Sequence, residues 1–192
     1  MTEADFRSRR TTRRIEQALI KLLQDSPFEK ITVAQLCAAA TVSRSTFYAH
    51  YYDKYAIAER LVSTYQTQLE NRLAQRFERG NVADVQAMIA PLFKWLMTDS
   101  VTTRTLMKLH LPDADLTASL HHELTKHFTA FMLTVYRPTT KQVPLDYLVA
   151  QYVSWVMTEL DYQLQHGENA AVLAFSQQAQ NELFELANIA IE

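Results

Sequence analysis

The sequence has little of the material from which hairpins, disulfides and phosphate-binding loops are built. It contains two glycines and five prolines in 192 residues, which leaves few tight turns and no glycine-rich phosphate loop. Cys37 is the only cysteine, so an intramolecular disulfide is excluded. Its neighbours are small and apolar, which favours a buried structural thiol over a redox sensor.

Long apolar runs are also missing. No uninterrupted apolar stretch approaches the length needed to span a membrane, and the first residues lack the apolar segment of a signal peptide. We therefore expect a cytoplasmic protein that has no membrane partner.

The motifs of common hydrolases and metal sites are absent too. Glu123 and His127 are four residues apart and could reach the same ion from one helix, but two ligands do not make a metal site. Ser43, Ser45 and His50 resemble a nucleophile and a base, yet nothing nearby would stabilise an oxyanion. We expect no enzymatic activity, no cofactor and no metal.

The composition is that of a folded globular chain. Hydrophobic residues make up 48% of the sequence and charged residues 21%. Apolar residues at helical spacing dominate the chain, so we predict an all-α fold. The length allows one or two domains.

Charge is unevenly distributed along the chain. The formal net charge is −2, but residues 1–54 contain nine Lys and Arg against six Asp and Glu, whereas residues 55–192 contain ten against fifteen. A basic N-terminal segment on an acidic body is expected when only one end of a protein meets phosphate groups.

The segment 32–54 has the pattern of a helix-turn-helix followed by a further helix. Thr32 and Gln35 have the spacing of a capping box at the start of the first short helix. Ser43 is placed to cap the second helix, and Asp53 is placed to cap the third. A turn of about three residues joins the two short helices, as in DNA-binding proteins of this type.

The second of these helices displays hydrogen-bond donors, while Phe47 can turn inward as an anchor. The donors are Arg44, Ser45, Thr46, Tyr48 and His50. In a helix-turn-helix the first residues of this helix contact base edges, and nearby hydroxyls and cations hold phosphates. The alternative is a polar, solvated helix in an unrelated bundle.

The stretch TVSRSTFYAHYYDK resembles the recognition segment of the TetR family of bacterial transcriptional regulators. The matching residues are Val42, Ser43, Thr46, Phe47, Tyr48, His50 and Lys54. Thr41 stands where the family usually has glycine, and Tyr51 stands where it usually has phenylalanine. Since threonine tolerates positive φ poorly, the turn at Thr41 is where we expect this chain to differ from its relatives.

The resemblance implies a homodimeric repressor that binds a palindromic operator in double-stranded DNA and is released by a small-molecule effector. It implies that Arg44 and Ser45 contact base edges. The phosphate contacts would come from Thr32, Ser43, Thr46, Tyr48, His50 and Lys54, with Arg13 and Arg14 of a basic N-terminal arm. A co-regulator of the same fold that acts through protein–protein contacts is the alternative.

The basic arm runs into the start of a predicted helix that is capped by Thr11 or Thr12. Its arginines are Arg7, Arg9, Arg10, Arg13 and Arg14. Because cations at a helix start oppose the macrodipole, either DNA phosphates or solvation alone must account for them.

The remaining pattern predicts an N-terminal helix-turn-helix DNA-binding domain at 1–54 and a larger helical effector-binding and dimerisation domain at 55–192. A long helix is expected from Asp53 to Arg79, ended by Gly80. Further helices are expected at 81–97, with a kink or a division into two pieces at Pro91, at about 103–110, from Asp113 to Arg137, from Pro144 to His166, and from Asn169 to about Ile191.

The second domain offers candidates for an effector site and for a dimer interface. The effector-site candidates are Tyr65, Trp95, Met107, His110 and Phe128, although residues of these types at helical spacing are more often simple core. The last two helices are apolar on more than one face, which favours a four-helix dimer interface over burial within one chain.

Overall fold

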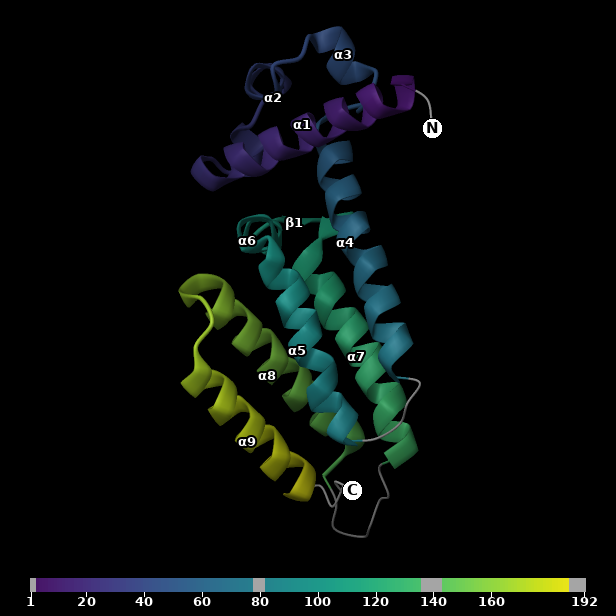
Figure 1. The fold of residues 1–192 in the computed structure, drawn as a ribbon, viewed down its shortest axis with the longest axis vertical. Helices are drawn as coiled ribbons and strands as arrows, with labels where there is room; N and C mark the ends of the chain where they lie inside the picture. Colours follow the sequence, from purple (N-terminus) through teal and green to yellow (C-terminus); the bar gives the residue numbers. More distant parts are fainter. Residues whose placement is uncertain (1–2, 78–81, 136–142, 187–192) are drawn as a thin grey trace. The chain divides into compact units, whose positions relative to one another are not determined.

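The computed structural model describes residues 3–77, 82–135 and 143–186, and within these ranges the chain is almost entirely helical, as predicted (Figure 1). The N-terminal elements are α1 (Glu3–Asp25), the 3₁₀ turn η1 (Phe28–Lys30), α2 (Val33–Ala40), α3 (Arg44–Tyr48) and α4 (Lys54–Phe77). They are followed by α5 (Val82–Thr98), α6 (Ser100–Met107), β1 (His110–Leu111), β2 (Ala114–Asp115), α7 (Leu116–Val135), α8 (Leu145–His166) and α9 (Ala170–Leu186).

The chain divides into two compact units. The first contains residues 1–65 together with 105–116, and the second contains residues 66–104 together with 117–192. The first unit therefore reaches beyond Lys54, where the sequence suggested a boundary, and includes the short β hairpin. The assignment of segments 1–54 and 55–192 to DNA binding and to effector binding stays a prediction.

The first unit is built around a small apolar core under α1. Ile15 and Leu19 of α1 are fully buried, as are Leu36 of α2, Phe47 of α3 and Ile57 of α4. The contacts between α1 and α2 are extensive. Each of these short helices buries one apolar face against the others, which leaves its polar face to solvent.

The start of α1 corrects the prediction of a helix capped by Thr11 or Thr12. The helix begins at Glu3, with Glu3 and Asp5 in its first turn, where acidic side chains complement the helix macrodipole. Thr11 lies inside the helix and its hydroxyl donates to the Arg7 carbonyl (3.1 Å). The five arginines are therefore residues of a helix and not of an extended arm, so each has a defined face.

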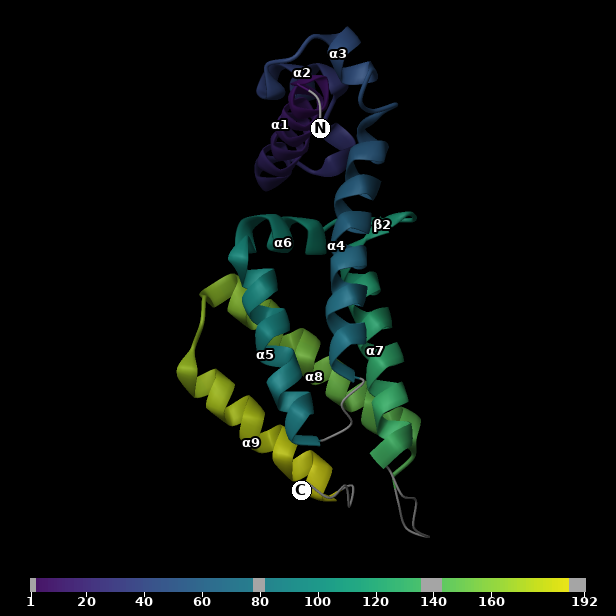
Figure 2. The same ribbon diagram turned by 45° about the vertical axis from the view of Figure 1, so that its right-hand side comes forward.

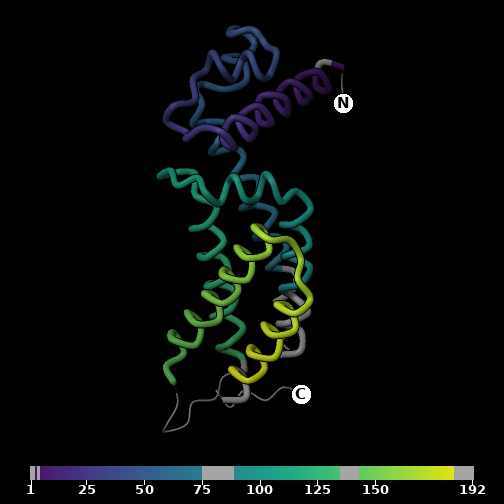
Figure 3. The backbone as a smooth tube through the Cα atoms, turned by 90° about the vertical axis from the view of Figure 1, so that its left-hand side faces the viewer, coloured from purple at the N-terminus to yellow at the C-terminus, as the bar shows by residue number. Residues whose placement is uncertain are grey.

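The second unit is a bundle of α5, α7, α8 and α9 together with the second half of α4 (Figure 2). The ring of Phe128 in α7 stacks on that of Tyr152 in α8, with ring centroids 3.9 Å apart. Figure 3 shows α8 and α9 as neighbouring antiparallel helices, and they are in contact.

The contact between α8 and α9 includes buried polar side chains. Glu159, Gln163, Ser176 and Gln180 are all less than 8% exposed. The Ser176 hydroxyl and the Gln163 amide (3.0 Å) both donate to the Glu159 carboxylate. Burial raises the pKa of Glu159, although these two hydrogen bonds act in the opposite direction.

Several predicted helix limits need correction. Pro91 lies within α5, which is one helix from Val82 to Thr98 and not two pieces, whereas the kink expected at Pro91 stays a prediction. The helix expected at 103–110 is α6 and begins at Ser100, where the Asp99 carboxylate accepts from the Thr102 amide (3.1 Å).

The hairpin at 110–115 replaces the predicted cap at Asp113. β1 and β2 pair antiparallel, with His110 opposite Asp115, and α7 begins only at Leu116. The imidazole Nδ1 of His110 lies 2.8 Å from the Asp115 carboxylate. This pairing and the turn at Pro112 hold the chain extended where a helix start was expected.

Other predicted limits are confirmed. The Asn169 side chain accepts from the amides of Ala171 and Val172, so it caps α9 as expected. α8 lies between Pro144 and Gly167, and Gly167 has a φ of 82°, which glycine adopts without strain. The predicted limits at Gly80, residue 81, Arg137 and Ile191 lie outside the described residues.

Within the described ranges, no helix is both long and apolar enough to cross a membrane.

Candidate nucleic-acid interface

The first helix of the predicted motif is held by the expected capping box. The Thr32 hydroxyl accepts from the backbone amide of Gln35 (3.3 Å), and the side-chain oxygen of Gln35 accepts from the backbone amide of Thr32 (2.8 Å). Ile31 and Leu36 flank this cap and are both buried, as expected for a hydrophobic staple. The capping box opposes fraying of the first turn, so α2 has a defined start at Val33.

The turn after α2 places Thr41 in the left-handed region, with φ 53° and ψ 53°. Among the described residues Thr41 is the one non-glycine residue with positive φ. Thr41 has the backbone conformation that glycine would favour at this position. Because threonine is β-branched, this conformation is strained. The expected departure at Thr41 is therefore a difference in strain and leaves the type of turn unchanged.

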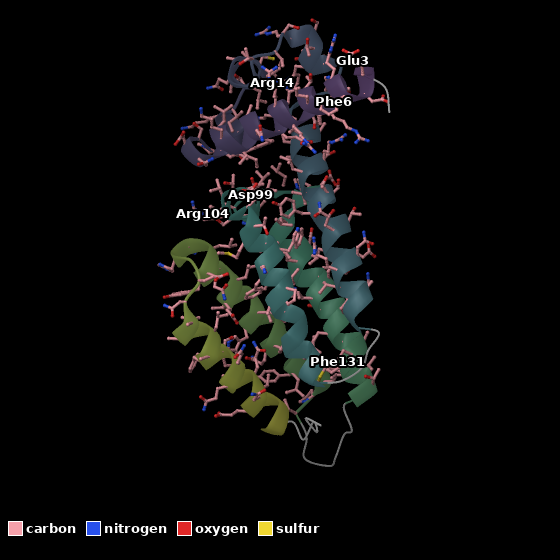
Figure 4. All side chains as sticks on the ribbon, in the orientation of Figure 1. Glu3, Phe6, Arg14, Asp99, Arg104 and Phe131 are labelled. Carbon is pink, nitrogen blue, oxygen red and sulfur yellow. The ribbon has the colours of Figure 1, made fainter. Side chains whose placement is uncertain are left out.

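Arg14 supports the same turn. Its guanidinium donates to the Thr41 carbonyl (2.9 Å), and Figure 4 shows Arg14 on the side of α1 that faces α2 and α3. Arg13 is exposed and points about 100° away from Arg14 around the helix. The two predicted arginines therefore lie on different faces of α1.

The start of α3 is organised by one hydroxyl. The Ser43 oxygen accepts from the Thr46 amide (3.0 Å), which confirms Ser43 as the N-cap. It also lies 2.8 Å from the hydroxyl oxygens of Ser45 and Thr46. Three hydroxyls therefore gather at the first turn of α3.

The anchor and the exposed side of α3 are as predicted. Phe47 has no exposed surface, while Arg44 and Ser45 are exposed and Tyr48 is 57% exposed. Within the part of the chain that the structure describes, Arg44 makes no hydrogen bond or ion pair. The helix thus exposes a guanidinium, a hydroxyl and a phenol to solvent, while the buried Phe47 ring fixes it to the core.

Tyr52 is a further exposed aromatic that the motif analysis did not single out. It follows α3 in the connection to α4 and is 86% exposed. A phenol that is so exposed has no packing role. Its position between the two predicted helices is the signal by which sequence reasoning could have marked it. It adds a second exposed phenol four residues after Tyr48.

His50 lies against α1. Its ring Nδ1 is 3.1 Å from the Thr12 hydroxyl oxygen. His50 and Thr46 line one side of an open groove of about 500 Å³, and Glu3, Arg7, Ser8 and Thr11 of α1 line the other. The sequence analysis named Arg7 in the basic arm and Thr11 as a candidate cap, but it did not bring α1 together with Thr46 and His50, because contacts across 35 or more positions leave no local pattern.

Lys54 is held by the protein itself. Its ammonium donates to the carbonyls of Phe28 (2.8 Å), Glu29 (3.0 Å) and Ile31 (2.9 Å). It also lies 4.6 Å from the centre of the Phe28 ring. An ammonium has three N–H bonds, so all donors of Lys54 are used within the chain. The predicted phosphate contact is incompatible with this arrangement unless those bonds open.

Tyr51 and Asp53 complete the connection to α4. The Asp53 carboxylate accepts from the Ala56 amide (2.9 Å) and caps α4 as predicted. The Tyr51 hydroxyl donates to Glu16 of α1 (2.7 Å), and the same carboxylate oxygen lies 3.2 Å from Nε of Arg60. Burial, and secondly the Glu16 carboxylate, raise the pKa of Tyr51. The hydroxyl that distinguishes Tyr51 from phenylalanine therefore ties α1 to the segment before α4.

Residues 15–61 match the family model for bacterial regulatory proteins of the tetR family. This range contains α2, the strained turn, α3 and its caps. This N-terminal segment therefore carries the sequence pattern of tetR-family regulatory proteins. No curated protein matches the chain significantly.

Solved structures of TetR-family regulators share the fold over nearly the whole chain. A TetR transcriptional regulator from Streptococcus agalactiae 2603V is 22% identical, covers 95% of this chain and 97% of its own, and gives a TM-score of 0.63. A gamma-butyrolactone receptor described as ArpA-like is 16% identical over 94% and 98% of the two chains, with a TM-score of 0.59. Thermus thermophilus FadR, a TetR-family repressor solved with lauroyl-CoA, is 16% identical over 91% and 94%, with a TM-score of 0.56. The chain therefore has the fold of TetR-family transcriptional regulators.

The predicted effector-site residues of this TetR-type fold are divided between the two units. Tyr65, Met107 and His110 belong to the first unit, and Trp95 and Phe128 belong to the second. Phe128 is buried, and the Trp95 ring lies 4.7 Å from the Arg72 guanidinium carbon. An effector site formed by these five residues stays a prediction.

The pair Glu123 and His127, which the sequence analysis considered as metal ligands, lies on one helix. Glu123 and His127 lie 3.4 Å apart on α7, and Lys126 pairs with the same carboxylate (3.1 Å). In the described ranges, no three His, Cys, Asp or Glu side chains come together as a metal site. Cys37 is buried, as predicted.

Proposed function

We propose that this chain is a sequence-specific DNA-binding transcriptional regulator, a homodimeric repressor that a small-molecule effector releases from a palindromic operator. The observation that supports it most directly is the exposed face of α3. Capped by Ser43 and anchored by the buried Phe47, α3 presents Arg44, Ser45 and Tyr48 outward. Polar side chains on a fixed short helix of a helix-turn-helix are suited to the major groove.

We assign base contacts to Arg44 and Ser45, because they lie at the start of α3 and are exposed. An arginine can bond guanine with two donors, which discriminates by about 1–3 kcal/mol. The phosphate contacts are assigned to Thr32, Ser43, Thr46, Tyr48, His50, Arg13 and Arg14. Lys54 is omitted from this assignment because its three donors are bonded to backbone carbonyls.

Dimerisation through α8 and α9 is supported by exposed aromatic residues on these helices. Tyr147 and Tyr162 of α8 and Phe175 of α9 are exposed, and the Phe175 ring lies 6.2 Å from that of Trp155. Large apolar side chains that stay exposed in one chain are suited to an interface with a second copy. Such a dimer would place two copies of α3 about one helical turn of DNA apart.

Release by an effector follows from a difference in affinity between two states of the dimer. An effector that binds more tightly to the state with mismatched α3 spacing lowers DNA affinity by that difference. One TetR-fold relative was solved with lauroyl-CoA, which supports a small-molecule site in proteins of this fold.

The decisive experiment selects bound sequences from random duplex DNA with the purified protein. We expect a palindromic motif, and Arg44→Ala should lose preference at one position of each half-site. Lys21→Ala, which removes an exposed cation from the far end of α1, is the matched control and should keep the motif. An unchanged motif in Arg44→Ala would refute the base contact.

A co-regulator that acts through protein–protein contacts is the second candidate. It is favoured by the exposed phenols of Tyr48 and Tyr52 and by the internal bonding of Lys54, since tyrosines also serve protein interfaces. Failure to bind any duplex at low salt would favour this function over operator binding.

A further inference from the structure

The groove between α1 and α3 has the chemistry of an anion site. It is open, measures about 500 Å³, and lies beside the helix to which we assign base contacts. Arg7 and Ser8 of α1 and Thr46 and His50 of the α3 segment all line it, and each can donate a hydrogen bond. One carboxylate, that of Glu3, also lines the groove.

The contact with Thr12 bears on which ring nitrogen of His50 can donate a hydrogen bond. The Thr12 hydroxyl lies 3.1 Å from His50 Nδ1, on the side of the ring opposite to Nε2. If the hydroxyl donates to Nδ1, the neutral imidazole carries its proton on Nε2 and can donate with that nitrogen. Thr12 is therefore placed to act as a positioning residue, because a hydroxyl that donates to Nδ1 favours the tautomer suited to an anionic oxygen.

Arg7 pairs with Glu3 one turn earlier in α1. The Arg7 guanidinium lies 3.8 Å from the Glu3 carboxylate, and both side chains are more than 80% exposed. An exposed pair at this distance is weak and opens readily. A phosphate in the groove would compete with Glu3 for Arg7 and would be repelled by the same carboxylate.

We propose that the α1–α3 groove binds a phosphate group of the DNA backbone, with Arg7 and His50 as donors, Thr12 as the positioning residue and Glu3 as a built-in competitor. The proposal rests on the proposed DNA binding and deepens it. It separates Arg7 from Arg9 in the basic cluster, because these two residues point about 200° apart around α1 and only Arg7 lines the groove.

The test measures affinity for a selected operator duplex between 50 and 200 mM salt. Arg7→Ala should reduce the slope of log affinity against log salt by about one, since one phosphate contact is lost. The matched control is Arg9→Ala, which removes an exposed arginine two positions away and should leave the slope unchanged. Glu3→Gln should bind DNA about two- to fivefold more tightly, because the competing charge is gone.

Thr12 needs a measurement that a merely structural role would not change. In ¹⁵N-labelled protein, the ring nitrogen shifts of His50 should report the Nε2–H tautomer in the wild type and in Thr12→Ser. Thr12→Val should lose that signature and should also weaken DNA binding. Thermal unfolding of each variant, followed by circular dichroism, checks that the helices are intact.

The outcomes separate the two proposals. If the wild type binds no duplex at low salt, both the proposed function and the groove proposal are overturned. If the wild type binds DNA but Arg7→Ala and Arg9→Ala change the salt slope equally, or Glu3→Gln gains no affinity, the groove proposal alone is overturned.

Discussion

Replacing Thr41 by glycine should stabilise the N-terminal unit. For a residue other than glycine, the left-handed backbone conformation that Thr41 adopts costs roughly 1–2 kcal/mol. Glycine, in turn, loses roughly 0.5–1 kcal/mol more conformational entropy on folding. The Thr41 side chain is exposed, so its removal leaves no cavity, and the Arg14 bond is to the backbone carbonyl, which remains. The net gain should be about 0.5–1 kcal/mol.

Native-state hydrogen exchange is the appropriate assay, because it reports on α2 and α3 directly. Trp95 and Trp155 both lie in the second unit, so tryptophan fluorescence would follow the wrong part of the chain. Amides of α2 and α3 should exchange about two- to fivefold more slowly in Thr41→Gly. In a thermal scan a first unit of this size should melt about 2–8 °C higher.

The matched control is Thr64→Gly, the same replacement at an exposed position within α4. Here glycine should destabilise by about 0.3 kcal/mol, because threonine is the better helix former. If Thr41→Gly destabilised the protein as Thr64→Gly does, the assignment of strain to the turn would be refuted.

The remaining predictions concern Lys54 and Glu159. Lys54→Met keeps the aliphatic chain but removes the ammonium hydrogen bonds to three carbonyls, of which, among the described residues, only that of Phe28 has a further donor, the Ile31 amide. The free energy of unfolding should therefore fall by about 2–3 kcal/mol in urea titrations, while the salt slope of DNA binding stays as in the wild type. A reduced salt slope with intact stability would restore the phosphate role of Lys54. Because the pKa of Glu159 is raised in the folded state, its contribution to stability is complete below the ordinary glutamate value and is lost as the pH rises through the raised one. Thermal scans between pH 5 and pH 8 should therefore show the stability of Glu159→Gln increasing relative to the wild type as the pH rises, and a difference that is independent of pH would contradict this.

The sequence was sufficient where the determining interactions are local. The caps at Thr32, Ser43 and Asp53 each depend on a residue three positions away, and all three are present. The all-α class was equally accessible, because helical apolar spacing extends along the whole chain. The inward position of Phe47 followed from the same spacing.

The errors arose where local signals compete or where the partner is distant in sequence. Thr11 has the chemistry of a cap, yet the residues before it favour a helix and the Thr11 hydroxyl bonds within it. The hairpin at 110–115 depends on cross-strand pairing that no helical periodicity can show. The carbonyls that engage Lys54 come from residues 23 to 26 positions earlier, which a motif of 14 residues cannot include.

The bonding of Lys54 affects how the family motif should be used as evidence. Its lysine joins η1 to the first turn of α4, and Phe47 of the same motif fills the core, so these two positions are required for the fold whether or not the protein touches DNA. A chain that lost its operator during evolution would keep both residues and would still match the motif. Evidence that separates a DNA-binding regulator from a co-regulator of the same fold must therefore come from positions that folding leaves unused, and Arg44 is the clearest of these in this chain.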